Sequence, residues 1–333
     1  MRRLLGSLFG AAAALRVAAY RRGLLSSSRL ASPVISVGNL GVGGSGKTPV
    51  VRRVAELLLE AGEPVAILSR GYGGSFAGEA LVVSDGRDVL ASPAAAGDEP
   101  VMLARALPGV VVAVGRRRDR VGRAVLARFG RRVLVLDDGF QHLRLARDLD
   151  VVCLDVRDLA DRPLPAGRLR EAPAALARAD VVLLTRTEAA SETELHALEA
   201  RVGPGRAHRV ERRTAGLRGL DGRAAAAPRR AYLLAGIARP ERFERDVDAA
   251  GCAVVGRAFF RDHHRFCASE VADVVARARA ASADAIVTTA KDAVRLESLP
   301  GTSLPLLVLE IAAAIGDEAR FRDRLLEVAR RAA

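Results

Sequence analysis

Residues 38–51 read GNLGVGGSGKTPVV, and the eight residues from position 41 to 48 fit the pattern G-x-x-x-x-G-K-[ST]. In such a loop, backbone N–H groups surround the phosphates of a nucleotide, the lysine reaches the β- and γ-phosphates, and the hydroxyl binds Mg²⁺. We therefore predict a nucleotide-binding loop made of Gly41, Val42, Gly43, Gly44, Ser45, Gly46, Lys47 and Thr48.

The residues on either side of the loop support this prediction. Residues 33–38 form a short apolar run with β-branched residues, which predicts a buried strand. Residues 48–61 carry apolar side chains at helical spacing, with Pro49 in the first turn, where its missing N–H costs nothing. Gly62 is a plausible end of that helix. A strand before the loop and a helix after it are the context that a phosphate-binding loop requires.

Strand-like runs recur along the chain, with helical stretches between many of them. In the first two thirds they lie at residues 65–68, 81–83, 110–114, 133–136, 151–154 and 181–184. This alternation predicts an α/β fold, a P-loop NTPase-type parallel sheet with helices on both faces.

A second, smaller α/β domain is expected after residues 200–230, where the pattern fades into Arg, Ala, Gly and Pro. Its strands are predicted at residues 232–234, 253–255, 285–288 and 306–309. The chain has 333 residues, which is enough for two domains. We expect an N-terminal membrane-associated helix in residues 1–30, a P-loop kinase domain in residues 31–215, and the smaller domain in residues 216–333.

Composition and charge narrow the classes of partner. The net charge of +13 suits anionic lipid or a phosphorylated substrate. The arginines are scattered and lack interleaved aromatic residues, so we expect no nucleic-acid partner. The three cysteines lie far apart and outside any C-x-x-C motif, which argues against a disulfide framework or a zinc site and fits a reducing cytosol. No obligate protein partner is evident.

The N-terminal segment MRRLLGSLFGAAAALRVAAYRR predicts an amphipathic helix. Its apolar run, residues 4–15, is about half of the ~20 residues that a membrane-spanning helix needs. An apolar stripe flanked by arginines is typical of a helix that lies on an anionic membrane surface. A helix docked on the domain and a cleaved signal peptide are the alternatives. A nucleotide site that begins at residue 41 argues against export, because ATP is cytosolic. The stripe consists of Leu4, Leu5, Leu8, Phe9, Leu15 and Tyr20.

Two aspartates follow the apolar run at residues 133–136. A carboxylate at the C-terminal end of a parallel strand faces the crevice where ligands bind, so Asp137 and Asp138 are predicted to bind Mg²⁺ together with Thr48. The alternative is a solvated turn. Val42 stands where the signature-lysine ATPases carry lysine, and the chain lacks the Asn-Lys-x-Asp motif of GTPases. A small-molecule phosphotransferase is the remaining P-loop class.

Phosphoryl transfer to a hydroxyl needs a group that accepts the hydroxyl proton. The candidates are residues 97–100 (GDEP), expected to form a loop, and residues 261–266 (RDHHRF), which hold two of the five histidines. An Asp of the first segment and a His of the second could form a pair when the two domains close. The alternative is that each segment is a surface loop. Residues 69–74 (SRGYGG) are expected either to contact a phosphate or sugar or to form a tight turn. Residues 116–120 (RRRDR) are expected either to contact an anionic headgroup or to form a solvated charge run.

Together these motifs resemble the tetraacyldisaccharide 4′-kinase family, the lipid A 4′-kinases. The resemblance runs in the family's order from about residue 4 to 295 and also includes residues 137–142 (DDGFQH), 164–171 (LPAGRLRE) and 288–294 (TTAKDAV). It implies ATP-dependent phosphorylation of the 4′-hydroxyl of an acylated glucosamine disaccharide 1-phosphate, giving lipid IV-A. It also implies an enzyme at the cytoplasmic face of the bacterial inner membrane, with two α/β/α domains that close around ATP and Mg²⁺.

The resemblance assigns roles to single residues. Asp98 takes the place of the catalytic Asp and Lys47 that of the phosphate-binding lysine, while Glu99 lies in the Mg²⁺ region with Asp137 and Asp138. The histidine partner of the Asp falls on His263, with His264 as the second choice. Ala290 stands where the family often has Glu. Two rival functions stay open at this point, a P-loop ATPase or switch that acts on a partner and a soluble sugar or nucleoside kinase.

Overall fold

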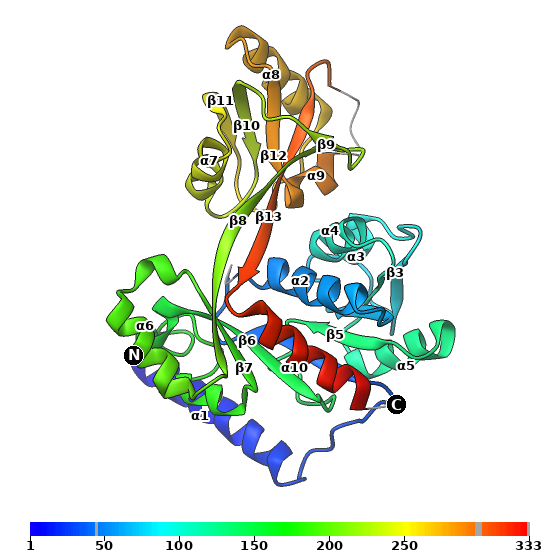
Figure 1. Ribbon diagram of the computed structural model, residues 1–333, viewed down its shortest axis with the longest axis vertical. Coiled ribbons are helices and arrows are strands. Elements are labelled where there is room, and N and C mark those ends of the chain that lie inside the picture. The colour runs from blue at the N-terminus through cyan, green and yellow to red at the C-terminus, as the bar shows by residue number, and fades with distance from the viewer. Residues whose placement is uncertain (44–45, 297–301, 332–333) are drawn as a thin grey trace. The chain divides into compact units, whose positions relative to one another are not determined.

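The computed structural model describes residues 1–43, 46–296 and 302–331. The chain divides into two compact units, here called unit 1 (Met1–Arg212 and Ala313–Ala333) and unit 2 (Arg213–Ala312). It leaves unit 1 within strand β8 (Ala207–Gly219) and returns within strand β13 (Leu306–Ile315), as Figure 1 shows.

Unit 1 is built on a mostly parallel sheet whose strands follow the order β3-β4-β2-β5-β1-β6-β7-β8. At one edge, β3 runs antiparallel to its neighbour, β4. Six of the strands, β1, β2, β4, β5, β6 and β7, are buried along their whole length, as expected where helices cover both faces of a sheet. The predicted fold class is thereby confirmed. The first seven strands are β1 (Val34–Asn39), β2 (Val65–Ser69), β3 (Leu81–Asp85), β4 (Val111–Val114), β5 (Val133–Asp137), β6 (Leu149–Asp155) and β7 (Val181–Thr185).

The helices of unit 1 bury the apolar sides that the sequence pattern gives them. Val50 and Val54 of α2 are fully buried against the sheet, and Val121 and Val125 of α5 pack on β2, β4 and β5. The helices are α2 (Lys47–Glu60), α3 (Pro93–Ala96), α4 (Asp98–Ala106), α5 (Arg118–Phe129), α6 (Glu192–Val202) and α10 (Glu318–Arg331), with 3₁₀ turns η1 (Val156–Ala160), η2 (Pro173–Arg178) and η3 (Thr187–Ala189).

The last helix belongs to unit 1, although the sequence assigned residues 216–333 to one C-terminal domain. Phe321 and Leu325 of α10 are fully buried, and the carboxylate of Glu318 accepts two hydrogen bonds from Arg53 of α2 at 2.7 and 2.9 Å. The chain therefore passes through unit 2 and comes back. A pattern of strands and helices carries no signal for such a return.

The boundary between the units, at Arg212 and Arg213, falls inside the predicted junction at residues 200–230, and β8 runs through it as a strand of 13 residues. Its first half pairs in parallel with β7, and the two-residue strand β9 (Ala224–Ala225) pairs antiparallel with its end. Buried, half-buried and exposed residues follow one another along β8 without a regular pattern. The strand therefore lacks the continuous apolar run that characterises the buried strands of unit 1.

Unit 2 contains a parallel sheet in the order β11-β10-β12-β13, covered on two faces. Alternate residues of β10 face opposite sides: Leu233 packs with Phe243 of α7, and Leu234 with Val274 of α8. The predicted strands of the smaller α/β domain are present. The elements are β10 (Arg230–Ala235), α7 (Pro240–Ala249), β11 (Ala253–Phe259), α8 (Ala268–Ala280), β12 (Ala285–Thr289) and α9 (Ala290–Leu296).

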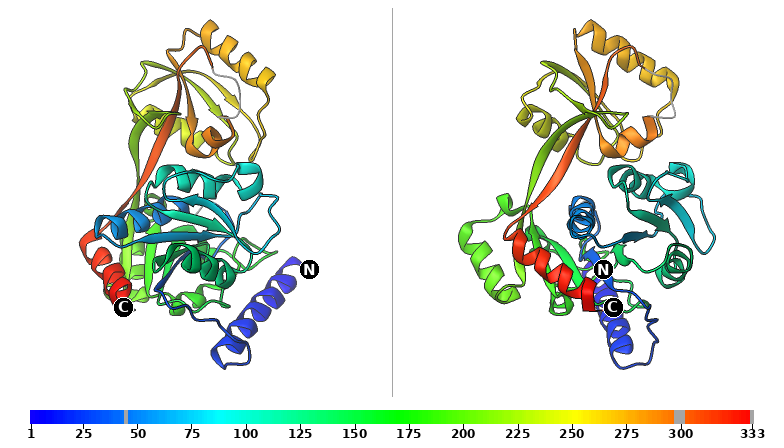
Figure 2. Two further views of the ribbon diagram at one scale, coloured as in Figure 1. Left: turned by 90° about the vertical axis from the view of Figure 1, so that its right-hand side faces the viewer. Right: turned by 45° about the vertical axis from the view of Figure 1, so that its right-hand side comes forward.

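The N-terminal helix α1 (Arg2–Arg21) is a separate rod at the margin of unit 1 (Figure 2). It is docked along one side: a Cβ at Gly6 would lie 2.8 Å from Cβ of Ala166, and Arg16 donates to the carbonyl of Gln141 at 3.1 Å. In the described part of the chain, no helix combines the length and hydropathy needed to cross a bilayer.

Candidate functional site

The predicted nucleotide loop joins the C-terminal end of β1 to the first turn of α2. Gly43 and Gly46 have φ values of 104° and 79°, which a residue with a side chain rarely adopts. Gly44 and Ser45 lie outside the described residues. No side chain among the described residues caps α2, so the backbone N–H groups of its first turn are available to a phosphate.

The ammonium group of Lys47 lies among polar groups at this end of the sheet. Its Nζ donates to Oδ1 of Asn39 at 3.1 Å and lies 3.6 Å from Oδ1 of Asp138. Arg170 binds the same two residues, with Nη1 and Nη2 donating to Asp138 at 2.8 and 2.9 Å and Nη2 donating to Asn39 at 2.7 Å. Lys47 and Arg170 thus hold the Asp138 carboxylate between two cations beside the loop.

The two adjacent aspartates have different surroundings. Asp137 is 5% exposed and accepts a hydrogen bond from Ser69 at 3.0 Å. Burial, followed by the charges of Glu99 and Asp138, raises the pKa of Asp137 to about 6, although the charge of Lys47 acts in the opposite direction. Burial also acts to raise the pKa of Asp138, but the hydrogen bond from Arg170 and the charge of Lys47 outweigh it and lower that pKa.

Residues 97–100 do not form the expected loop, because Asp98 and Glu99 open helix α4. Acidic residues are favourable in the first turn of a helix, and a proline is tolerated there. Gly97 (φ 90°) precedes the helix, and a Cβ on it would lie 2.4 Å from the carbonyl oxygen of Tyr72. The segment 71–74 is therefore a tight turn packed against the start of α4. Asp98 is half-buried and Glu99 is exposed.

The arginine-rich run at residues 116–120 is solvated only in part, because Arg116 and Arg120 are exposed but the residues between them are not. Arg118 is 5% exposed and Asp119 is 2% exposed, and Asp119 accepts two hydrogen bonds from Arg117. Burial lowers the pKa of the Arg118 guanidinium, while the nearby charges of Asp137 and Asp138 act in the opposite direction. The guanidinium therefore lies in the electric field of the two aspartates.

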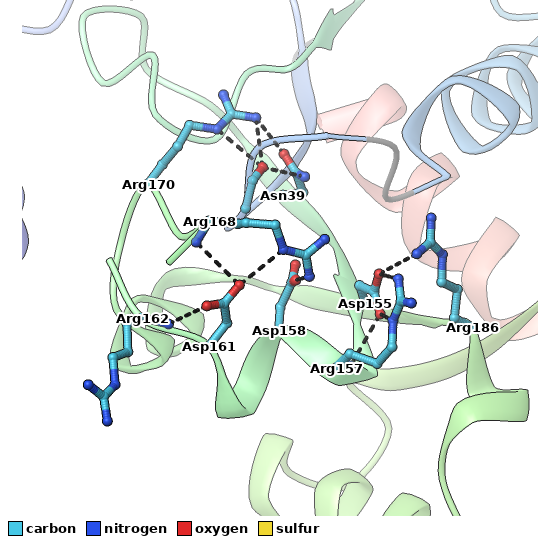
Figure 3. A network of polar contacts seen from close by, with 10 residues as sticks. Asn39, Asp155, Arg157, Asp158, Asp161, Arg162, Arg168, Arg170 and Arg186 are labelled. Atoms are coloured by element: carbon cyan, nitrogen blue, oxygen red, sulfur yellow. Dashed lines mark hydrogen bonds and ion pairs between the residues drawn. The ribbon is translucent and has the colours of Figure 1, made fainter. Parts of the chain in front are cut away.

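The segment before Glu171 fixes the start of the nucleotide loop. The N–H of Val42 donates to the carbonyl of Arg168 at 2.8 Å, and the N–H of Arg170 donates to the carbonyl of Leu40 at 2.7 Å. Arg168 is in turn held by Asp158 at 2.9 Å and Asp161 at 3.1 Å (Figure 3). The sequence pattern indicates this segment only as part of a motif, and it does not indicate Arg170 and Asn39 as site residues.

The two histidines of unit 2 have separate environments. Nε2 of His264 donates to the carboxylate of Glu270 at 3.0 Å, and the ring stacks on Phe260 with centroids 4.5 Å apart, so His264 is a packed structural residue. His263 is 44% exposed, has a left-handed φ of 60°, and lies beside Lys291. Asp98 belongs to unit 1 and His263 to unit 2.

His142, at the end of the DDGFQH motif, gives a prediction about stability. Burial lowers its pKa from 6.5 to about 4, and the charge of Arg118 acts in the same direction. The folded protein thus binds a proton at His142 less readily than the unfolded chain. The stability that His142 contributes by staying neutral is therefore fully present above about pH 6.5 and is lost as the pH falls towards about 4. We expect His142→Gln to reduce the loss of unfolding free energy between about pH 7 and about pH 5 by roughly 1 kcal/mol, after allowance for solvent screening.

Urea unfolding of both proteins at both pH values measures this effect. The change in unfolding free energy between the two pH values is compared between the wild type and the variant. Asp137 and Asp292, whose pKa values are raised by burial, change stability in the opposite direction with pH, but they do so in both proteins. An equal pH dependence in the wild type and the variant would contradict the prediction.

Comparison with known proteins adds to this geometry. The family model described as tetraacyldisaccharide-1-P 4'-kinase matches residues 2–330. A tetraacyldisaccharide 4'-kinase of Anaeromyxobacter dehalogenans (strain 2CP-C) is 48% identical, over 94% of this chain and 82% of that protein. One of Desulfotalea psychrophila is 41% identical, over 91% of this chain and 89% of the relative.

A solved structure is similar along nearly the whole chain. The crystal structure of LpxK from Aquifex aeolicus in complex with ATP has a TM-score of 0.82 and 30% sequence identity, and the match covers 98% of this chain and 97% of that one. The matched segment includes the nucleotide loop, the paired aspartates and the two histidines of unit 2. The chain belongs to the tetraacyldisaccharide-1-P 4'-kinase family.

Proposed function

We propose that this protein transfers the γ-phosphoryl group of ATP to the 4′-hydroxyl of a tetraacylated glucosamine disaccharide 1-phosphate, the step that gives lipid IV-A in lipid A biosynthesis. The observation that carries the proposal is the arrangement of Lys47, Asn39, Arg170 and Asp138 where β1 meets α2. Cations and helix N–H groups gathered there neutralise phosphate charge, which is the main requirement of phosphoryl transfer. Family membership supports the choice of acceptor.

The roles of the residues follow from their chemistry. Lys47 and the loop of residues 41–48 bind the β- and γ-phosphates. Asp98, half-buried at the start of α4, accepts the proton of the 4′-hydroxyl, and His263 is its partner.

Mg²⁺ would be held by the Thr48 hydroxyl and by Asp137 and Asp138, with Glu99 nearby. These residues fit the ion, since a carboxylate whose pKa is raised by burial and by neighbouring carboxylates is stabilised by a divalent cation. When bound, Mg²⁺ would offset the negative charge of the phosphates and of the transferred group. Among the described residues no three His, Cys, Asp or Glu side chains form a metal cage, so phosphate oxygens and water would complete the coordination.

Attachment to the membrane surface is part of the proposal. Leu4, Leu8 and Leu15 of α1 are 67%, 59% and 72% exposed, and their spacing places them on one side of the helix. Such a side can enter the interface of an anionic bilayer while the arginines beside it contact headgroups. A substrate with four acyl chains stays in the bilayer, so we place the enzyme at the cytoplasmic face of the bacterial inner membrane.

A change in membrane binding is expected when this apolar side is made polar. Replacing Leu4, Leu8 and Leu15 together by glutamine should weaken binding to vesicles of anionic phospholipid at least ~10-fold, because each leucine loses the free energy of burial in the interface. Deletion of residues 1–22 should move the protein from the membrane pellet to the supernatant. Co-sedimentation with vesicles measures both effects. The matched control replaces Val89 and Leu90, which are also exposed, by glutamine. Equal sedimentation of the triple variant and the wild type would contradict the proposed binding of α1 to the membrane surface.

Transfer of label tests the proposed reaction directly. Purified protein, Mg²⁺, γ-labelled ATP and tetraacyldisaccharide 1-phosphate in mixed micelles should give labelled lipid, and an acceptor lacking the 4′-hydroxyl should give none. A P-loop switch would instead hydrolyse ATP slowly until its partner is added. A soluble kinase would label a sugar or nucleoside without detergent or lipid. Absence of labelled lipid would rule out the proposed reaction.

A further inference from the structure

Lysine is almost absent from this protein. Of the 52 lysines and arginines, only Lys47 and Lys291 are lysines, and all the others are arginines. A chain so biased towards arginine is expected to carry arginine wherever either cation would serve. One of the two lysines lies in the nucleotide loop. The other lies at the start of α9, outside the residues to which the proposed function gives a role.

Lys291 makes two contacts that a compact ammonium group suits. Its Nζ lies 3.1 Å from Oδ1 of Asp262 and 3.1 Å from Nε2 of His263, and its side chain is 20% exposed. An ammonium carries three rotatable donors at one point and can serve both acceptors. The guanidinium of arginine is planar and longer, and it cannot occupy the same point between a carboxylate and a ring nitrogen.

The other side of the His263 ring meets a second cation, which has partners of its own. Nη2 of Arg295 lies 3.2 Å from Nδ1 of His263, and Nη1 donates to Asp292 at 3.2 Å and to the carbonyl of His264 at 3.3 Å. Asp292 is fully buried and accepts hydrogen bonds from the N–H of Gly236 and the hydroxyl of Thr289. Arg295 is therefore anchored independently of the imidazole.

These contacts decide which ring nitrogen carries the proton. A neutral imidazole has one acceptor nitrogen, and both neighbouring cations can only donate. Among the described residues, Nη1 of Arg295 binds two oxygen acceptors, and Nζ of Lys291 binds the carboxylate of Asp262. Donation from the compact charge of Lys291 to Nε2 favours the tautomer with the proton on Nδ1, in which Nη2 of Arg295 does not donate to the ring. A histidine on a left-handed backbone, with its N–H bound to the carbonyl of Gly236 at 3.2 Å, is held in place at both ends.

We propose that Lys291 is a positioning residue of the phosphotransfer site: its ammonium group fixes the orientation and the tautomer of His263, and arginine cannot replace it. The inference rests on the proposed function in one respect, the participation of His263 in proton transfer. It adds a residue that acts through His263 and does not itself touch the substrate.

Steady-state kinetics of the full-length protein in lipid micelles test the role of Lys291. Lys291→Met and Lys291→Arg should each lower kcat about tenfold or more, because a misaligned imidazole loses its contribution to proton transfer. The KM for ATP should change by less than about twofold, since uniform binding is not affected. Arg277→Met is the matched control: it removes one positive charge from unit 2, on the surface of α8, and should leave kcat unchanged. Lys291→Gln is the second variant if methionine destabilises unit 2.

The tautomer of His263 is a second measurement, and it would not change on substitution of Lys291 if Lys291 had only a structural role. Nitrogen NMR of protein labelled in its five histidines, with signals assigned through His263→Gln and His264→Gln, should show Nδ1 protonated in neutral His263 of the wild type. In Lys291→Met, Arg295 becomes the stronger neighbouring donor and the proton should move to Nε2. The signal of His264, which is bound to Glu270, should stay as it is.

The possible outcomes separate the inference from the proposed function. Wild-type turnover in His263→Gln overturns both the role of His263 and the role of Lys291. Loss of turnover in His263→Gln, with wild-type turnover in Lys291→Met, overturns the inference alone. Wild-type turnover in Lys291→Arg overturns the requirement for an ammonium group, and an unchanged tautomer in Lys291→Met overturns the positioning mechanism.

Discussion

Replacing Lys47 by alanine is expected to lower turnover at least ~10²-fold, because the variant loses a cation directed at the phosphates in a site where charge is poorly screened. The geometry also predicts that the protein remains folded. Asn39 and Asp138, the two neighbours of the Lys47 ammonium, keep their hydrogen bonds to Arg170 at 2.7 and 2.8 Å. The measurement is initial-rate transfer of label to the lipid, alongside a thermal melt.

The control for Lys47 lies on the same helix. Arg52→Ala removes one positive charge from α2 and breaks an ion pair with Glu56 at 2.8 Å, which is a helix-surface pair worth a few tenths of a kcal/mol. Its turnover should stay within about twofold of the wild type, since Arg52 is not directed at the phosphates. If Lys47→Ala kept more than about one tenth of the wild-type rate, the assignment of Lys47 to the transferred phosphate would be wrong.

The parts of the fold that the sequence predicts are those with a local and regular signal. The strands at residues 133–136 and 151–154 are apolar runs because both faces of the sheet are covered, and the structure has them as β5 and β6. The proximity of Asp138 to Lys47 follows from the pairing of these strands. β5 is paired in parallel with β1, so their C-terminal ends meet at one edge.

The parts that the sequence could not predict depend on distant contacts or on mixed signals. Arg170 reaches Asn39 across 131 positions, and no spacing rule connects them. The return of α10 to unit 1 is equally invisible, since it depends on packing of Phe321 and Leu325. At residues 97–100 the glycine and the proline indicate a loop, but both residues are compatible with the first turn of a helix, and the tertiary structure selects the helix.

Asp98→Ala is expected to reduce turnover at least ~10²-fold, as for the loss of a general base. Asp98→Asn is the more precise variant because the amide keeps the size of the side chain and can still accept a hydrogen bond, yet it cannot take a proton. Both variants should lower kcat while the KM for ATP changes little, since the lost interaction operates in the transition state. Rates measured at saturating ATP over a range of lipid concentrations separate the two parameters.

The matched control for Asp98 must reproduce its structural role, which is that of an acidic residue in the first turn of a helix. Glu241 occupies that position in α7 and is exposed. Glu241→Gln should destabilise its helix by the same few tenths of a kcal/mol to 1 kcal/mol that Asp98→Asn costs α4, and it should leave turnover unchanged. Near wild-type turnover in Asp98→Asn, with the melting temperature shifted as in Glu241→Gln, would reduce Asp98 to a helix-terminal residue and require another proton acceptor. The opposite result, a lost rate in a protein as stable as Glu241→Gln, would support Asp98 as the base, because the loss of an acidic residue from the first turn of a helix would not by itself account for it.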